Sequence, residues 1–298
     1  MSRRAAELLE YAAARAAEGA LSALPEVAGR AAGALAGRAA RAAGLRREVA
    51  LRQVADAFPE RDEAWVRATV EACYLHFGRE MAALARLSRV DPARLAAATR
   101  GTRELTRLLG DGGRIVVTGH LGNWELAGAM LAGLGYPVVA VVKQQANRRF
   151  DRRLEALRAR LGMETVPMAA AGRRLPGALA RGAVVALVAD QDALRRVISV
   201  PFLVRPASTF RGPARLALAE DVPLVFGAMV RDEGGYRVVS APVERPPGGP
   251  AAGPEPGEPD APGPEEALTR AWTARLEEAV RAFPEQYFWF HRRWKTTP

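Results

Sequence analysis

Cysteine and lysine are nearly absent from this 298-residue sequence. The single cysteine, Cys73, excludes an internal disulfide framework and a zinc site built on several cysteines, and it fits a reducing cytoplasm. Lysine occurs only at Lys143 and Lys295, so arginine supplies nearly all of a formal net charge of +10. That charge favours an anionic partner: a phosphorylated substrate, an acidic carrier protein, an anionic membrane surface or nucleic acid. The competing interpretation is a compositional bias that leaves the arginines merely solvated.

Long apolar runs are also missing. The longest uncharged run, residues 126–142, contains Gly133, Gly135 and Pro137, and it therefore predicts a helix, a turn and a strand instead of a membrane span. Charged residues interrupt the N-terminus before any apolar segment develops, which argues against a secretory signal.

Several catalytic motifs have no counterpart in the sequence. No serine lies in a G-x-S-x-G elbow, and neither a P-loop nor a G-x-G-x-x-G fingerprint occurs. Asp190 and Asp192 have a spacing found in metal sites, but no histidine or third carboxylate is near them in the sequence. We therefore expect no metal and no cofactor, and the sequence disfavours a serine hydrolase, a kinase and a dehydrogenase.

The distribution of apolar residues predicts an α/β fold. Residues 1–100 have a helical composition rich in alanine, leucine, arginine and glutamate. From Arg114 onward, short apolar runs alternate with helical segments, which predicts a central, largely parallel or mixed sheet flanked by helices over residues 101–298. The breaks expected between the N-terminal helices are Pro25, Gly44, Pro59 and Pro92.

The expected elements follow from this alternation. Strands are predicted at residues 115–118, 138–142, 165–166, 184–189, 222–230 and 236–240, with the last two paired across a turn. Helices are predicted from about residues 123, 148, 175, 213 and 265. Residues 244–266 carry eight prolines and no hydrophobic pattern, which predicts a flexible surface loop.

His120 and Glu125 stand five positions apart just after an apolar, β-branched strand. A histidine at such a junction can act as a general base near neutral pH when a carboxylate fixes its tautomer and supports its positive charge. The backbone N–H groups near Gly122 and Asn123, at the start of the next helix, are candidates for stabilising an oxyanion. The competing interpretation is a junction histidine with only structural hydrogen bonds.

Four separated segments, in this order, resemble the bacterial late acyltransferases of lipid A biosynthesis, within the lysophospholipid and glycerolipid acyltransferase superfamily. An isolated H-x4-E pair is common by chance, whereas the ordered set is specific. The segments are residues 119–125; Asn147 with Asp151, Arg158, Arg160 and Gly162; residues 189–192 followed by 200–202; and residues 284–295.

The resemblance implies transfer of a fatty acyl group from an acyl carrier protein, or from coenzyme A, to a hydroxyl of a lipid A-type glycolipid. It implies the cytoplasmic face of the bacterial inner membrane as the setting, and no nucleic acid partner. Members of this family usually carry a hydrophobic N-terminal segment, whereas residues 1–45 here are rich in alanine and repeatedly charged, so we expect peripheral association. His120 would remove the acceptor proton and Glu125 would orient the imidazole. The implied substrate-binding residues are Asn123, Arg158, Arg160, Asp190, Asp192, Arg292 and Arg293.

Alternatives remain open for several of these residues. Arg158 and Arg160 fit equally well as solvated charges of a helix face. The family pattern also suits the aspartates at 190 and 192 as structural support of the active centre, paired with Arg158 or with the Arg195–Arg196 pair, and the alternative for them is local turn-capping. The aromatic and basic residues 287–295 suit packing against the core, a membrane interface or nucleic acid. The alternative functions are a phospholipid or phosphatidylinositol-mannoside acyltransferase, and a non-catalytic basic protein that binds membranes or nucleic acid.

Overall fold

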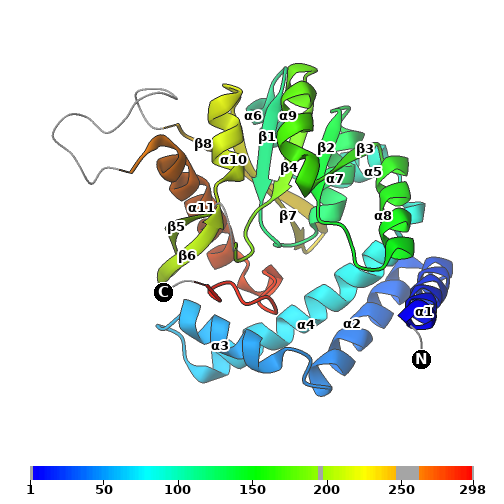
Figure 1. Ribbon diagram of the computed structural model, residues 1–298. Coiled ribbons are helices and arrows are strands. Elements are labelled where there is room, and N and C mark those ends of the chain that lie inside the picture. The colour runs from blue at the N-terminus through cyan, green and yellow to red at the C-terminus, as the bar shows by residue number, and fades with distance from the viewer. Residues whose placement is uncertain (1–2, 194–196, 246–261, 297–298) are drawn as a thin grey trace.

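Six strands form the central sheet in the order β3-β2-β4-β1-β7-β8 (Figure 1). The computed structural model describes residues 3–193, 197–245 and 262–296. All neighbouring strands of this sheet run parallel except β8, which pairs antiparallel with β7 at one edge. The strands are β1 (Arg114–Thr118), β2 (Val138–Val142), β3 (Met163–Pro167), β4 (Val184–Val188), β7 (Leu224–Asp232) and β8 (Gly235–Val243). The predicted α/β fold with a largely parallel sheet is confirmed.

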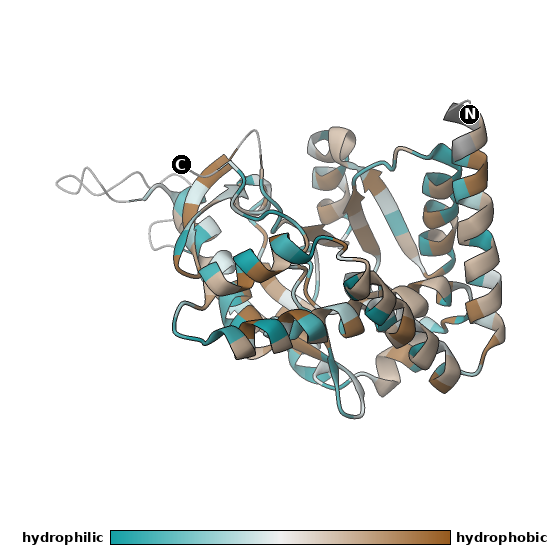
Figure 2. Ribbon diagram, turned by 90° about the horizontal axis from the view of Figure 1, so that it is seen from below, coloured by the Kyte–Doolittle hydropathy of each residue, from teal (hydrophilic) through white to brown (hydrophobic). Residues whose placement is uncertain are grey.

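Helices cover both faces of the sheet because the strands are apolar on both sides. In β1, Val116 belongs to one buried cluster, whereas Ile115 and Val117 belong to the other. This alternation is the two-residue period of a strand. Figure 2 shows the strands mostly in the hydrophobic colour and the helices with mixed surfaces.

The helices that pack on the side of Val116 are α5 (Pro92–Ala98), α6 (Thr102–Leu109), α7 (Trp124–Gly133) and α8 (Arg148–Arg160). The opposite side is covered by α9 (Ala171–Ala180), α10 (Gly212–Ala219) and α11 (Pro264–Ala282).

The N-terminal region is helical, as its composition predicts. It contains α1 (Arg3–Ala23), α2 (Glu26–Ala42), α3 (Arg47–Ala57) and α4 (Glu63–Ala85). Pro25, Gly44 and Pro59 lie between these helices, and Pro92 is the first residue of α5, so all four predicted breaks are confirmed. In Figure 1, α2 and α4 cross below the sheet, beyond the carboxyl ends of its parallel strands.

One hairpin is not predicted by the sequence pattern, and one predicted loop lies largely outside the described residues. The strands β5 (Val197–Phe202) and β6 (Arg205–Phe210) form an antiparallel hairpin that the sequence pattern does not reveal, and they pack beside α11. Most of the predicted proline-rich loop, residues 246–261, lies outside the described residues. Within the described ranges, no helix combines the length and the apolar character that a bilayer crossing requires.

Candidate active site

His120 and Asp190 meet at the carboxyl edge of the sheet. His120 follows β1 by two residues, and Asp190 follows the neighbouring strand β4 by two residues. The ladder between these strands extends one residue further, since Ala189 N–H donates to the Thr118 carbonyl at 3.0 Å. Parallel neighbouring strands therefore bring the two side chains together, with 2.6 Å between His120 Nδ1 and Asp190 Oδ1.

A second hydrogen bond fixes the same pair. The backbone N–H of His120 donates to Asp190 Oδ2 at 2.8 Å, so both carboxylate oxygens hold the histidine. Asp190 is buried, with 2% of its side chain exposed, whereas the His120 side chain is 21% exposed. The carboxylate is thus shielded from water while the imidazole keeps access to a substrate.

Electrostatics make this imidazole a stronger base than an ordinary histidine. Burial alone would lower the pKa of His120, but the charge and hydrogen bond of Asp190, together with the charge of Glu125, raise it above its usual value. Burial would likewise raise the pKa of Asp190, but His120 holds it below the usual range. The pair is therefore built to stabilise an imidazolium next to a carboxylate.

The second nitrogen of the imidazole, Nε2, is not bound to Asp190. Its closest polar neighbour is the Gln191 amide, with Nε2 to Nε2 at 3.3 Å. The ring of Trp124 contacts the imidazole edge-on at a centroid distance of 4.7 Å, and Phe288 lies at 6.2 Å. An aromatic wall and one amide therefore surround the nitrogen that would accept a proton.

Glu125 occupies a different position from the one its spacing predicts. Its carboxylate accepts two hydrogen bonds from the Arg158 guanidinium, with Arg158 Nε to Glu125 Oε2 at 2.9 Å. No hydrogen bond joins Glu125 to His120 in the described part of the chain, and the carboxylate that orients Nδ1 is Asp190. Glu125, five residues after His120, lies in the first turn of α7. Its carboxylate contacts Arg158 of α8 and acts on His120 through its charge alone.

The predicted oxyanion donors at Gly122 and Asn123 are already engaged. Gly122 N–H donates to the Gln286 carbonyl at 2.9 Å, and Asn123 N–H donates to the Met229 carbonyl at 2.8 Å. The prediction is wrong because this loop is pinned between β7 and the C-terminal segment. The Asn123 side chain caps α7 by accepting from Leu126 N–H at 2.9 Å, which is a structural role.

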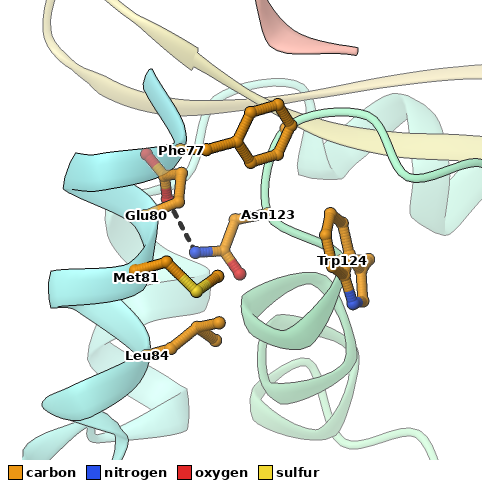
Figure 3. A pocket seen from close by; sticks show the side chains of 7 residues that line it. Phe77, Glu80, Met81, Leu84, Asn123 and Trp124 are labelled. Carbon is orange, nitrogen blue, oxygen red and sulfur yellow. Dashed lines mark hydrogen bonds between the residues drawn. The ribbon is translucent and has the colours of Figure 1, made fainter. Parts of the chain in front are cut away.

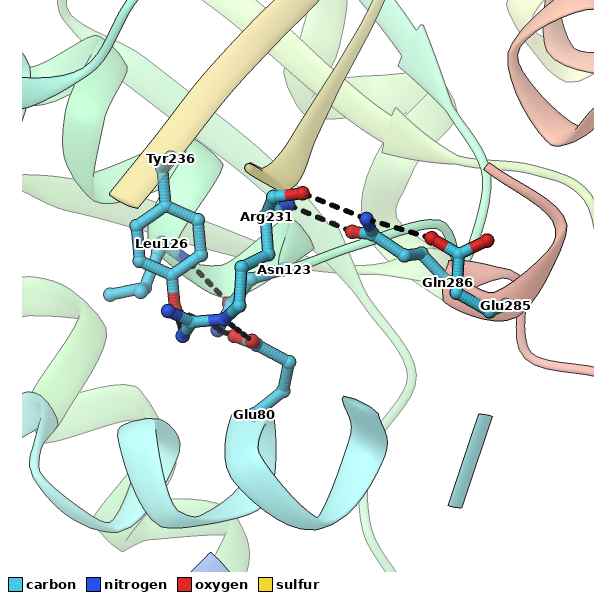
Figure 4. A network of polar contacts seen from close by, with 7 residues as sticks. All are labelled: Glu80, Asn123, Leu126, Arg231, Tyr236, Glu285 and Gln286. Atoms are coloured by element: carbon cyan, nitrogen blue, oxygen red, sulfur yellow. Dashed lines mark hydrogen bonds and ion pairs between the residues drawn. The ribbon is translucent and has the colours of Figure 1, made fainter. Parts of the chain in front are cut away.

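A buried polar network holds this loop from behind (Figure 4). The Glu80 carboxylate accepts from Asn123 Nδ2 at 2.6 Å, from Arg231 Nε at 2.6 Å and from the Tyr236 hydroxyl at 2.7 Å. Gln286 exchanges two hydrogen bonds of 2.8 Å with the backbone of Arg231. The network therefore connects α4, the start of α7, both strands of the β7–β8 hairpin and the C-terminal segment.

An apolar hollow lies beside the histidine loop, between α4 and α7 (Figure 3). Its apolar side chains come from Phe77, Met81 and Leu84 on one helix and Trp124 on the other. Trp124 also contacts the His120 ring, so the hollow adjoins the candidate base.

The model of the bacterial lipid A biosynthesis acyltransferase family matches residues 6–296, which is nearly the whole chain. The chain belongs to this family. Its similarity to individual members is lower: it is 28% identical over 195 residues to the lipid A biosynthesis palmitoleoyltransferase of Escherichia coli (strain K12), covering 62% of this chain and 57% of that protein. The same values hold for the lipid A biosynthesis acyltransferase of Shigella flexneri.

A second group of relatives is matched over a shorter region. The phosphatidylinositol mannoside acyltransferase of Mycobacterium tuberculosis (strain H37Rv) is 28% identical over 117 residues, which are 38% of this chain and 37% of that protein. The chain thus spans little more than half the length of the first curated relatives that it matches.

Of the remaining predicted substrate-binding residues, some are hydrogen-bonded within the protein and one is exposed. Arg160 donates to the carbonyls of Leu87 and Val90 at 3.3 and 3.2 Å, which explains its role without a substrate. Arg293 is buried and donates to Ser208 O and Thr209 Oγ1, each at 2.6 Å.

Arg293 is thus unavailable to a substrate because it lies under the β5–β6 hairpin, whereas Arg292 is exposed. Asp192 accepts from the Thr296 hydroxyl at 2.8 Å instead of from an arginine. The Arg195–Arg196 pair, a predicted partner of the aspartates, lies outside the described residues.

The aromatic residues of the C-terminal segment pack into the core. Trp289 is fully buried and Trp294 is 9% exposed, which selects packing over an exposed stacking surface. The segment also supports the site directly, since Phe288 N–H donates to the His120 carbonyl at 3.0 Å.

Sequence patterns missed Gln191, Glu80 and Arg231 as parts of this site. A usable signal existed for Gln191, because it directly follows Asp190 at the carboxyl end of a strand. Glu80 and Arg231 carried no signal, since they lie 151 positions apart and meet only through the fold.

Proposed function

We propose that this chain is an acyltransferase that moves a fatty acyl group from a thioester of acyl carrier protein, or of coenzyme A, to a hydroxyl of a lipid A-type glycolipid. The observation that carries the proposal is the His120–Asp190 pair, with 2.6 Å between Nδ1 and the buried carboxylate and with the His120 side chain 21% exposed. Family membership supports the class of reaction.

In this mechanism His120 acts as the general base. Asp190 keeps the proton on Nδ1, so Nε2 offers its lone pair to the acceptor hydroxyl. As Nε2 takes the hydroxyl proton, the oxygen attacks the thioester carbonyl and forms a tetrahedral oxyanion. The C–S bond then breaks, the ester forms, and the imidazolium returns its proton to the departing thiolate.

The surrounding side chains support the other parts of the reaction. The acceptor hydroxyl displaces the Gln191 amide from Nε2, and the amide then donates to the oxyanion, since Gly122 and Asn123 have no free N–H to offer. Glu125, held by Arg158, adds negative charge that favours the imidazolium.

The proposal extends to the setting of the reaction. The N-terminal helical region, residues 1–100, is the part that faces the membrane, and its helices α2 and α4 lie below the sheet (Figure 1). Residues 101–298 form the acyltransferase domain. Association is peripheral, at the cytoplasmic face of the bacterial inner membrane. The lipid A relatives support this placement of the acceptor, and the mannoside relatives support the alternative acceptor class.

The deciding experiment measures acyl transfer with purified protein. A radiolabelled acyl carrier protein thioester is mixed with a lipid A precursor or with a phosphatidylinositol mannoside, and the lipid product is weighed by mass spectrometry. We expect a mass gain of one acyl group on the lipid A precursor, abolished by His120→Ala. Full activity of folded His120→Ala, or labelling of the mannoside alone, would overturn the proposal.

The matched control is Asp111→Asn, which removes an exposed carboxylate in the loop before β1, at the opposite edge of the sheet from His120. We expect it to retain normal transfer. The same assay with acyl-coenzyme A as donor distinguishes the two thioesters.

A further inference from the structure

Two arginines at the start of α8 face a hollow that α8 shares with α1. The hollow is about 210 Å³ and is lined by Tyr11, Arg149, Arg152 and Arg153. Arg149 and Arg152 are exposed and form no ion pair within the described ranges of the chain. The hollow therefore presents two unneutralised guanidinium groups and one phenol.

Three further arginines of α8 are occupied. Arg153 pairs with Glu18 of α1, Arg158 pairs with Glu125, and Arg160 binds backbone carbonyls. Among the described residues, the arginines of α8 with no ion pair and no backbone carbonyl as partner are therefore Arg148, Arg149 and Arg152 near its N-terminus, and the last two line the hollow.

The hollow has fixed walls because a side chain ties its two helices together. Asn147 caps α8 by accepting from Arg149 N–H at 3.1 Å, and its amide donates to the Glu7 carbonyl of α1 at 2.9 Å. Asn147 is buried and lies in the loop that follows the carboxyl end of β2. The N-terminal end of α8 therefore lies at the same edge of the sheet as His120, and Figure 1 shows α1 below that end of α8.

The chemistry of the hollow suits a phosphate group. Guanidinium groups bind phosphate oxygens through paired, charge-assisted hydrogen bonds, and a phenol adds a further donor. The volume is several times the share of one water, about 30 Å³, and so admits a phosphate.

Exposed apolar side chains flank the arginines and select a lipid over a free anion. Leu8, one turn before Tyr11 on α1, is 47% exposed, and Phe150, next to Arg149, is 38% exposed. A phosphate with apolar groups beside it is the surface that an anionic phospholipid bilayer presents.

We propose that Tyr11, Arg149 and Arg152 form a binding site for the phosphate headgroup of an anionic membrane lipid. The site holds the carboxyl edge of the sheet, with His120, against the bilayer. It rests on the peripheral membrane association in the proposed function but involves no acyl transfer, so vesicle binding and the transfer assay test the two proposals separately.

The test is cosedimentation of the full-length chain with vesicles of phosphatidylcholine alone or of phosphatidylcholine mixed with phosphatidic acid. We expect preferential binding to the mixed vesicles. The double variant Arg149→Gln/Arg152→Gln should bind them about 30-fold more weakly, because each basic group near an anionic surface contributes about fivefold. Tyr11→Phe should weaken binding less.

The matched control is Arg103→Gln/Arg173→Gln, which removes the same charge from exposed positions on α6 and α9. An equal loss in this control would reduce the effect to net charge and overturn the site. Complete competition by millimolar inorganic phosphate would identify a site for free anions instead. Unchanged vesicle binding with weakened binding of an acidic acyl carrier protein would assign the arginines to a protein partner, and would also overturn it.

Discussion

Asp190 acts on His120 in two ways that experiments can separate. Its hydrogen bond to Nδ1 at 2.6 Å fixes the tautomer, and its charge raises the pKa of the imidazole. Loss of the carboxylate charge alone shifts the pH at which His120 titrates, whereas loss of the hydrogen-bond geometry lowers the transfer rate at every pH. The carboxamide of asparagine keeps the size of the side chain and removes the charge.

For Asp190→Asn we expect transfer to fall by about 10²- to 10⁴-fold, the usual contribution of a positioned base. The neutral imidazole is the active form, so wild-type activity is lost as the pH falls through the raised pKa of His120. Without the carboxylate this pKa is lower, and the acid limb of the pH–rate profile should move to lower pH. A reduced rate with an unmoved acid limb would contradict the electrostatic role.

Gln191 offers the one polar group within 3.3 Å of His120 Nε2 among the described residues. For Gln191→Leu we expect kcat to fall by about 10²-fold with little change in KM for the donor, the usual effect of removing an oxyanion donor. Steady-state kinetics over a range of thioester concentrations measures both constants. A rise in KM alone would make Gln191 a substrate-binding residue only.

His76 affects the stability of the fold and has no role in the proposed reaction. It is buried in α4, and Nε2 has no hydrogen-bond partner in the described structure. Burial lowers its pKa to about 4. The folded protein therefore holds this imidazole neutral well below the pH at which it would protonate in the unfolded chain.

The unfolded state binds the extra proton between about pH 6.5 and 4, so stability falls as the pH drops through that window. The shift corresponds to about 3 kcal/mol of unfolding free energy by pH 4. Urea unfolding of the wild type and of His76→Phe at pH 7.5 and 4 should show this additional loss only in the wild type. Equal losses in both would contradict it.

At the scale of elements, α2 and α4 pack through glycines. A Cβ atom at Gly78 of α4 would lie 2.2 Å from the Gly33 carbonyl and 2.8 Å from Gly37 N. Such distances require the helix backbones to approach more closely than any larger residue permits. The glycines at this helix contact are therefore required for packing and do not reflect compositional bias alone.

Gly78→Ala should destabilise the fold by about 1–3 kcal/mol, because the added methyl group forces the helices apart. Thermal unfolding followed by circular dichroism measures the effect. The control is Gly19→Ala in α1, where a Cβ meets nothing within 4 Å and helix propensity improves. A fall in Tm for Gly19→Ala as large as that for Gly78→Ala would contradict the packing explanation.

The loop between β1 and α7 illustrates which elements follow from sequence. The β-branched run of β1 predicts the strand, the apolar run that follows Asn123 predicts a helix from about residue 123, and both are confirmed. Gly122 has φ +64, and a Cβ there would lie 2.0 Å from the Met229 carbonyl. That approach depends on β7, more than 100 residues later, and no local pattern contains it.

At the scale of the whole molecule, strand order decides the site. Hydrophobic periodicity predicts the strands themselves, but β4 lies beside β1 although β2 and β3 come between them in the chain. The contact between His120 and Asp190 depends on that order, so spacing alone favours the nearer Glu125. The burial of Arg293 is hidden for the same reason, since the β5–β6 hairpin that covers it has no clear sequence pattern.

The buried ion pair between Glu80 and Arg231 joins the N-terminal helix α4 to strand β7 of the sheet. Glu80 is 2% exposed and its partner Arg231 is 12% exposed. Removing one partner leaves the other charge buried without compensation, at a cost of about 3–5 kcal/mol, whereas removing both restores an uncharged interior.

We therefore expect Glu80→Ala and Arg231→Met each to destabilise the fold strongly, and the double variant to lose at least about 1 kcal/mol less than their sum. Chemical denaturation of the four proteins completes this double-mutant cycle. Additive losses would show that the two charges act independently. Glu63→Ala with Arg67→Met, an exposed pair on the same helix, is the matched control and should be close to additive.

The C-terminal segment braces the loop that carries His120. Phe288 N–H donates to the His120 carbonyl, the Gln286 carbonyl accepts from Gly122 N–H, and the Gln286 side chain exchanges two hydrogen bonds with the backbone of Arg231. None of these contacts is needed to place Asp190, which depends on the neighbouring strands β1 and β4. A proteolytic cut just before Gln286 would therefore leave the strands that bring His120 and Asp190 together and remove the hydrogen bonds that hold the histidine loop.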